Sequence, residues 1–130
     1  MNGENFILDT NIIIDIFKNK ISKNEVILKS NKLFIPIIVL GELLYGAENS
    51  NNSNRHYKQV IEFIEITEIL YIDEFTANFY AEIKTELKKS GNPIPENDIW
   101  IAAISKQNNI TLLTKDKHFN KIKKLEIKEI

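Results

Sequence analysis

The chain has 130 residues, with 17 lysine or arginine residues against 18 aspartate or glutamate residues, and its formal net charge at pH 7 is −1. That length fits a single domain, 1–130, and a hydrophobic content of 43% suits an ordinary globular core. With no cysteine and two histidines, the sequence excludes disulfides and a cysteine- or histidine-rich zinc site, so a metal ion would be held by oxygen. It contains neither a basic leader nor an apolar run of membrane length, and we expect a soluble, cytoplasmic protein.

Short β-branched runs alternate with longer helical patterns along the whole chain. In chain order, we expect a strand at 6–8, helices at 11–17 and 25–30, a strand at 33–35, helices at 36–47 and 57–64, and a strand at 69–72. A run of Asn and Ser residues, 49–54, is expected to form an exposed loop. The second half continues with helices at 75–87 and 98–106, a strand at 110–113, a helical turn at 119–122 and a strand at 125–130.

Strands that alternate with helices predict an α/β fold with a mainly parallel, roughly five-stranded central sheet covered by helices on both faces. In open sheets of this kind, ligands bind outside the carboxyl ends of the strands. Residues that directly follow the predicted strands are therefore the first candidates for a functional site.

Several common chemistries have no support in the sequence. The four glycines stand at positions 3, 41, 46 and 91, and they form neither a phosphate-binding glycine loop nor a nucleophile elbow. The two histidines, His56 and His118, are interpreted as surface residues because neither has neighbours that suggest a proton relay. Carboxylates are the remaining candidates.

Each of four acids admits an ordinary structural interpretation when it is considered alone. Asp9 follows the first strand and is suited to cap the next helix, and either Asn97 or Asp98 is suited to cap the helix at 98–106. Glu42 interrupts an apolar helix, where a buried carboxylate requires a partner, preferably a cation. Asp116 follows the strand at 110–113, where a solvated turn acid is common.

Considered together, the four acids indicate a site, because two of them end parallel strands and two lie on adjacent helices. Carboxylates that lie so close together repel one another, and they would have to take up protons unless a cation neutralises their charge. Mg²⁺ and Mn²⁺ prefer such oxygen ligands and assist phosphate chemistry by activating water and neutralising charge on the attacking and leaving oxygens. We therefore expect a site for one or two of these ions.

Four segments of the chain resemble, in order, the four motifs of PIN-domain ribonucleases, and their sequences are most similar to those of the VapC-type toxins of toxin–antitoxin pairs. The segments are Asp9-Thr10-Asn11-Ile12-Ile13-Ile14-Asp15, Gly41-Glu42-Leu43-Leu44-Tyr45-Gly46-Ala47, Asn97-Asp98-Ile99-Trp100-Ile101-Ala102-Ala103 and Thr114-Lys115-Asp116-Lys117-His118-Phe119. The resemblance implies that Asp9, Glu42, Asp98 and Asp116 are the catalytic, metal-binding acids. It also implies that Thr10, Asn11 and Thr114 orient them.

The resemblance further implies a PIN-like three-layer α/β/α domain with the activity of a metal-dependent endoribonuclease. Its substrate would be structured RNA, either transfer or ribosomal RNA, and its products would carry 5′-phosphate and 3′-hydroxyl ends. A cognate antitoxin would cover the acidic pocket, and the toxin would form a homodimer and a toxin–antitoxin hetero-oligomer.

Residues near the motifs have weaker assignments. Asp15 lies more than a helical turn beyond Asp9 and is expected to be exposed, Glu96 is expected to be a loop charge, and Trp100 suits either base stacking or the core. Five lysines beyond the last acid form either an RNA-facing patch or a solvated surface, and Lys115 and Lys117 are the predicted RNA contacts. The five are Lys115, Lys117, Lys121, Lys123 and Lys124.

Three alternatives remain open at this point. A PIN-fold nuclease need not be a toxin and could process RNA for the cell. A phosphotransfer domain also places an Asp after its first parallel strand, but the segment after Asp9 lacks the expected adjacent acid. A non-catalytic interaction module would leave the four acids without a common purpose.

Overall fold

The computed structural model describes residues 4–22 and 30–129, and its centre is a five-stranded sheet in the order β3-β2-β1-β4-β5. Every neighbouring pair of strands is parallel. The strands are β1 (Glu4–Leu8), β2 (Ser30–Pro36), β3 (Glu68–Leu70), β4 (Thr111–Leu113) and β5 (Ile127–Lys128). The predicted α/β fold with a parallel, five-stranded sheet is therefore confirmed.

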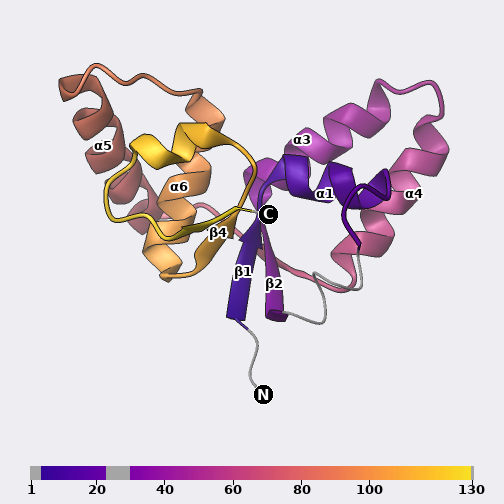
Figure 1. Cartoon of the computed structure of the whole chain (residues 1–130). Helices are drawn as coiled ribbons and strands as arrows, with labels where there is room; N and C mark the ends of the chain where they lie inside the picture. Colours follow the sequence, from indigo (N-terminus) through magenta and orange to yellow (C-terminus); the bar gives the residue numbers. More distant parts are fainter. Residues whose placement is uncertain (1–3, 23–29, 130) are drawn as a thin grey trace.

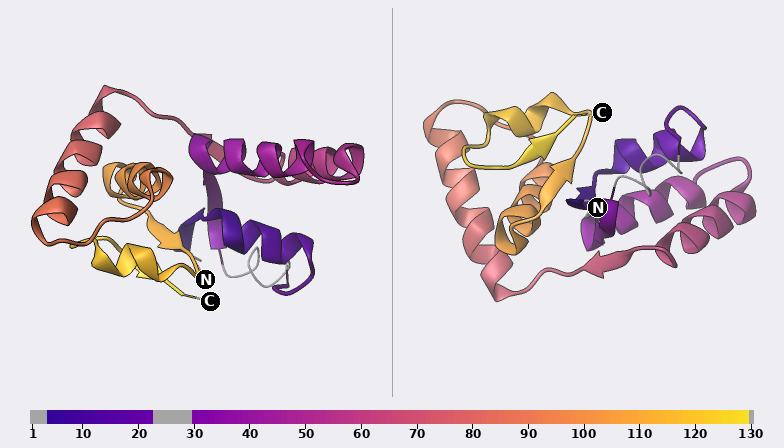
Figure 2. Two further views of the ribbon diagram at one scale, coloured as in Figure 1. Left: turned by 90° about the horizontal axis from the view of Figure 1, so that it is seen from above. Right: turned by 60° about the horizontal axis from the view of Figure 1, so that its bottom comes forward.

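Helices pack on both sides of this sheet. They are α1 (Thr10–Phe17), α3 (Ile37–Glu48), α4 (Ser53–Ile64), α5 (Glu74–Lys89), α6 (Glu96–Asn108) and the short 3₁₀ helix η1 (Lys117–Lys121). Figure 1 shows α1, α3 and α4 grouped on one side, with α5, α6 and η1 on the other, and both views in Figure 2 preserve this grouping. No helix in the described ranges is long and apolar enough to cross a bilayer.

The core forms where the central strands meet α1 and α6. Ile7 and Leu8 of β1 and Leu112 of β4 are fully buried, as expected for strands that are covered on both faces. Residues 101–104 of α6 are also fully buried, so this helix has no wide polar face there. Burying one large aliphatic side chain stabilises the fold by about 1.5–3 kcal/mol, so these strands hold the site on a rigid base.

Several predicted boundaries are wrong by a few residues. The predicted strand at 69–72 ends at Leu70, because Asp73 and Thr76 form a capping box that starts α5 and turns the chain out of the sheet. The Asn/Ser loop is shorter than expected, because α4 already begins at Ser53, and the last strand comprises only Ile127–Lys128.

Helix α6 begins at Glu96, two residues earlier than expected, and its N-cap is Pro95 rather than Asn97 or Asp98. Proline suits a helix start because it lacks an N–H and its φ is fixed near the helical value. Of the helix predicted at 25–30, residues 25–29 lie outside the described residues, and Ser30 begins β2 instead.

The register of the two central strands brings distant parts of the sequence together. Leu8 of β1 lies opposite Leu113 of β4, so Asp9 and Thr114 follow them side by side at the carboxyl edge. The Asp9 N–H donates to the Leu113 carbonyl at 3.1 Å and continues the ladder by one step. This edge is where the sequence predicts the site.

Candidate active site

Asp9 is a nearly buried carboxylate, 4% exposed, that is held by uncharged donors. Its Oδ1 accepts the Thr10 N–H at 2.8 Å, which makes Asp9 the N-cap of α1. Its Oδ2 accepts the Thr114 hydroxyl at 2.6 Å and the Asn11 side-chain amide at 3.3 Å. Burial raises the pKa of Asp9 to about 6, and the nearby Asp98 and Glu42 carboxylates act in the same direction against these donors.

Thr114 joins two of the acids. Its buried Oγ1 accepts the Asp116 N–H at 2.9 Å and donates to Asp9. Because a hydroxyl carries one proton, accepting from Asp116 leaves that proton free to point at Asp9. The end of β4 thereby fixes both the first and the last predicted acid.

Glu42 projects from α3 and is bound to α1. Its Oε1 accepts the Thr10 hydroxyl at 2.7 Å, so Thr10 donates one hydrogen bond to each of two predicted acids, Asp9 through its N–H and Glu42 through its hydroxyl. Glu42 is half-buried, and no lysine, arginine or histidine in the described ranges lies within 4.0 Å of its carboxylate. The cation that the sequence calls for is not supplied by these residues.

Asp98 and Asp116 meet at His118. The His118 Nδ1 lies 3.1 Å from Asp98 Oδ2 and 3.0 Å from Asp116 Oδ1. Burial raises the pKa of Asp98, the hydrogen bond from His118 lowers it, and the neighbouring Asp116 charge raises it again. The interpretation of His118 as a mere surface residue is wrong. Its position two residues after Asp116, in the turn that follows β4, was the signal available in the sequence.

Asp15 and Lys115 form an ion pair between α1 and the loop after β4. Asp15 is 9% exposed, so the prediction that it is exposed is wrong, because α1 turns this face toward the loop rather than toward solvent. The ion pair lowers the pKa of Asp15. Lys115, a predicted RNA contact, is engaged here, and its N–H also donates to Asn11 Oδ1 at 3.3 Å.

Glu96 and Trp100 belong to a separate polar and aromatic cluster on α5 and α6. Glu96 is helical rather than in a loop, and it pairs with Lys84 at 3.1 Å. Trp100 stacks on Tyr80 with ring centroids 4.0 Å apart and is half-buried, so it is neither a core residue nor a free stacking platform. The other predicted RNA contact, Lys117, is exposed.

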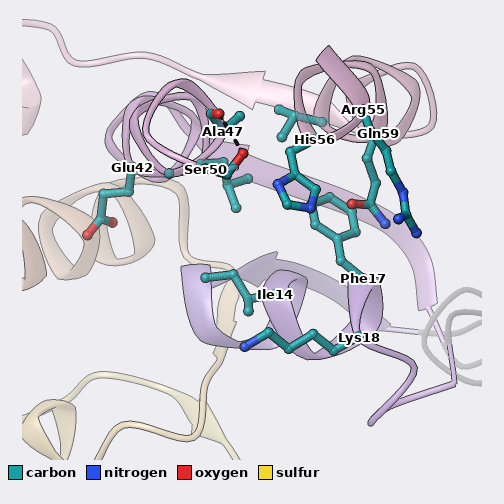
Figure 3. A pocket seen from close by; sticks show the side chains of 12 residues that line it. Ile14, Phe17, Lys18, Glu42, Ala47, Ser50, Arg55, His56 and Gln59 are labelled. Carbon is teal, nitrogen blue, oxygen red and sulfur yellow. Dashed lines mark hydrogen bonds between the residues drawn. The ribbon is translucent and has the colours of Figure 1, made fainter. Parts of the chain in front are cut away.

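A pocket of about 430 Å³ opens between α1, α3 and α4. Figure 3 shows Glu42 of α3 and Arg55 of α4 at opposite ends of this pocket, with Phe17 and Lys18 at the end of α1 on its other side. His56 also lines this pocket and is half-buried. The pocket has an apolar wall and a basic rim, a combination that sequence reasoning missed because its residues come from three helices.

The donor set fits a hard divalent cation. Four carboxylates come together from the N-cap of α1, from α3, from α6 and from the turn after β4. Burial raises the pKa of Asp9 and Asp98, and the neighbouring carboxylates add to the rise. Ligand atoms of Asp98, Asp116 and His118 all lie within 4.8 Å of one another. A cation among them would relieve the repulsion that the described residues leave in place.

Comparisons with known proteins show which family the chain resembles. The PIN domain family model matches residues 6–125. Ribonuclease VapC1 of Haemophilus influenzae strain R2866 is 35% identical over 126 residues, which cover 93% of this chain and 94% of that protein. The tRNA(fMet)-specific endonuclease VapC of Shigella flexneri is 32% identical over 111 residues, 84% of each chain.

Among solved structures, the DNA-bound VapBC complex of Salmonella typhimurium contains a chain that superimposes with a TM-score of 0.89 and 31% identity, covering 99% of this chain and 98% of that one. Both the sequence and the fold therefore match over almost the whole length. The chain belongs to the PIN domain family and, within it, to the VapC ribonucleases.

Proposed function

We propose that this protein is a Mg²⁺- or Mn²⁺-dependent endoribonuclease that hydrolyses phosphodiester bonds in structured RNA and acts as the toxin of a toxin–antitoxin pair. The observation that carries the proposal is the convergence of four acids from four separate segments at the carboxyl edge of one parallel sheet. The four are Asp9, Glu42, Asp98 and Asp116. VapC relatives at 35% identity support it.

The four acids would share the binding of the ion. Asp9, Asp98 and Asp116 would hold the ion, and Glu42 faces the same space from α3, held by Thr10. A bound divalent ion supplies positive charge against the phosphate and activates water for attack. The neutral donors Thr10, Asn11 and Thr114 keep the Asp9 oxygens in one orientation without neutralising their charge.

The basic rim of the pocket supplies cations for the RNA backbone. Lys18 and Arg55 line this pocket, and exposed Lys117 begins η1 directly after Asp116. Backbone phosphates are attracted by such residues regardless of base sequence, and this attraction weakens with added salt. Phe17 in the pocket wall offers an apolar surface for a base.

The names of the relatives support a choice of substrate class. Those from Shigella flexneri and Salmonella typhimurium are named tRNA(fMet)-specific endonucleases, and we infer that transfer RNA is the first RNA to test for this chain. Recognition of folded RNA depends on its shape and its exposed loops, so an unstructured oligonucleotide is a poor probe.

The partner follows from the solved complexes. Related VapC chains occur in VapBC complexes, and we infer that an antitoxin binds this chain and covers the acids, within a hetero-oligomer built on a toxin homodimer. A cytoplasmic location is consistent with such a partnership. Co-purification with the product of a neighbouring small gene would favour the toxin role, and a nuclease without such a partner would favour RNA processing.

The decisive experiment is cleavage of a pool of structured RNA, including transfer RNA, by purified, partner-free protein. We expect discrete cuts with 5′-phosphate ends in Mn²⁺ or Mg²⁺, and none in EDTA or with the Asp9→Asn and Asp98→Asn variants. Glu82→Gln, which changes an exposed acid on α5, is the matched control and should cut normally. Equal cutting by Asp9→Asn and wild type would refute the assignment of the site.

A further inference from the structure

We propose that His118 Nδ1 is a direct ligand of the divalent ion held by Asp98 and Asp116, and that this nitrogen makes the site prefer Mn²⁺ over Mg²⁺. The inference rests on the proposed function, because it assumes that the acids bind an ion. It adds a ligand that neither the four acids nor their spacing in the sequence provides.

The spacing of the three ligand atoms carries the argument. His118 Nδ1 lies 3.1 Å from Asp98 Oδ2 and 3.0 Å from Asp116 Oδ1. In an octahedral shell with bonds of about 2.1 Å, neighbouring ligand atoms are about 3.0 Å apart. The nitrogen therefore already has the separation of an adjacent ligand from each of the two carboxylate oxygens, and all three atoms lie within 4.8 Å of one another.

The backbone fixes the imidazole in this place. The His118 N–H donates to Asp116 Oδ1 at 2.9 Å, which ties the residue to the turn that starts η1. The next residue, Phe119, is fully buried and anchors η1 in the core. Because 45% of the His118 side chain is exposed, these contacts rather than burial keep the ring against the acids.

The chemistry of imidazole gives the metal preference. The hydrogen bond from His118 to Asp98 needs the proton on Nδ1. In the other neutral tautomer the proton is on Nε2, and Nδ1 has a free lone pair that can bind a metal. Carboxylate and water oxygens suit Mg²⁺ and Mn²⁺ alike, whereas imidazole is a ligand of transition metals rather than of Mg²⁺, so an added nitrogen shifts the preference toward Mn²⁺. The other possible role of His118, a charged partner that stays outside the coordination shell, would give no such preference.

Pulsed electron paramagnetic resonance of Mn²⁺ bound to the full, partner-free chain tests the proposal directly. We expect wild-type protein to show nitrogen modulation of the Mn²⁺ signal that changes when histidine is labelled with ¹⁵N. His118→Ala should lose the modulation and bind Mn²⁺ roughly 10–100-fold more weakly, with a smaller loss for Mg²⁺. His118→Asn places an oxygen where Nδ1 was, so Mg²⁺ binding should recover without the nitrogen signal.

His56→Asn is the matched control, because it removes the only other histidine and should keep the modulation. Mn²⁺ bound by wild type without histidine modulation would overturn the inference while leaving the proposed nuclease intact. Failure of wild type to bind Mn²⁺ or Mg²⁺ at all, together with cleavage that EDTA does not stop, would overturn both. The wild-type spectrum decides even if a His118 variant is unstable.

Discussion

The two ends of helix α1 carry acids of similar burial and opposite electrostatics. Asp9 at the start is 4% exposed, and Asp15 in the last turns is 9% exposed. Burial raises the pKa of Asp9 to about 6, whereas the ion pair with Lys115 lowers the pKa of Asp15. The difference lies in their partners, which are a hydroxyl and two amide groups for Asp9 and an ammonium group for Asp15.

This contrast separates an acid that completes the fold from one that is kept ready for a ligand. A buried carboxylate without a cation lowers the stability of the fold. Asp9 has no such cation, although Lys115 pairs with Asp15 on the same helix. The paired acid ties α1 to the loop that carries Asp116. The unpaired acid leaves its charge available to an ion from solution.

The largest expected effect concerns cleavage. Asp9→Asn removes one negative ligand and should reduce RNA cleavage by at least about 100-fold, since metal stabilisation of the transition state is worth several kcal/mol. Asp15→Asn should reduce it by less than about tenfold, because Asp15 acts only on the position of the loop. The comparison is made by measuring single-turnover cleavage rates of the same RNA with both variants. Equal losses of rate would contradict the assignment of different roles to Asp9 and Asp15.

The next effect concerns Thr114. Thr114→Val removes the hydroxyl that lowers the pKa of Asp9 and leaves the Asp116 N–H without this acceptor. We expect the pKa of Asp9 to rise above its value of about 6. The free energy of unfolding at pH 7 should fall by about 1–3 kcal/mol, as for a hydrogen bond to a charged group. Urea unfolding at pH 7 and pH 4 measures this, and the loss should be smaller at pH 4, where Asp9 is protonated.

An opposite effect on stability is expected for Asp9→Asn in the absence of metal. The shift to about 6 makes ionisation of native Asp9 unfavourable, so asparagine should stabilise the fold by up to about 3 kcal/mol above pH 6. In unfolded protein the group ionises near pH 4, so the advantage of the variant should grow between pH 4 and 6 and vanish below pH 4. Urea unfolding in EDTA across this range tests it, and an advantage that grows toward low pH would have the wrong sign.

The smallest effect on cleavage is expected for Lys115→Met, which breaks the ion pair but retains the aliphatic stem. Unfolding should become easier at pH 7, because Asp15 loses its cation. The difference from wild type should shrink as the pH falls and Asp15 is protonated, since the pair lowers the pKa of this group. If the variant cleaves more slowly only because the loop after β4 has moved, the salt dependence of its cleavage rate should match that of wild type. A weaker salt dependence in the variant would show that Lys115 contacts RNA.

The fold could be predicted from the sequence because it depends on local patterns, and the same patterns predicted that the acids would lie near one another. The β-branched runs, the proline at position 36 and the acids that follow strands fix the parallel sheet and its carboxyl edge. Asp9 and Asp116 follow β1 and β4, which are neighbours in the sheet, so their proximity is a consequence of topology alone.

The errors concern side chains whose partners come from another element. Asp15 looked exposed because nothing in α1 reveals that Lys115, one hundred positions later, reaches it. His118 looked like a surface residue because its partner Asp98 lies on α6, twenty positions earlier. The pairing of such residues depends on how loops pack against helices. The periodic pattern of apolar residues in the sequence does not predict this packing.

The strand order also governs when the site can exist during synthesis. β1 is made first, yet its partner β4 and the Thr114 hydroxyl that orients Asp9 come from the last fifth of the chain. A nascent chain whose last segment has not yet left the ribosome has Asp9 and Glu42 but lacks Asp116 and His118. While the growing chain is still on the ribosome and surrounded by RNA, it therefore lacks its complete set of acids. A chain truncated before β4 is expected to have no nuclease activity.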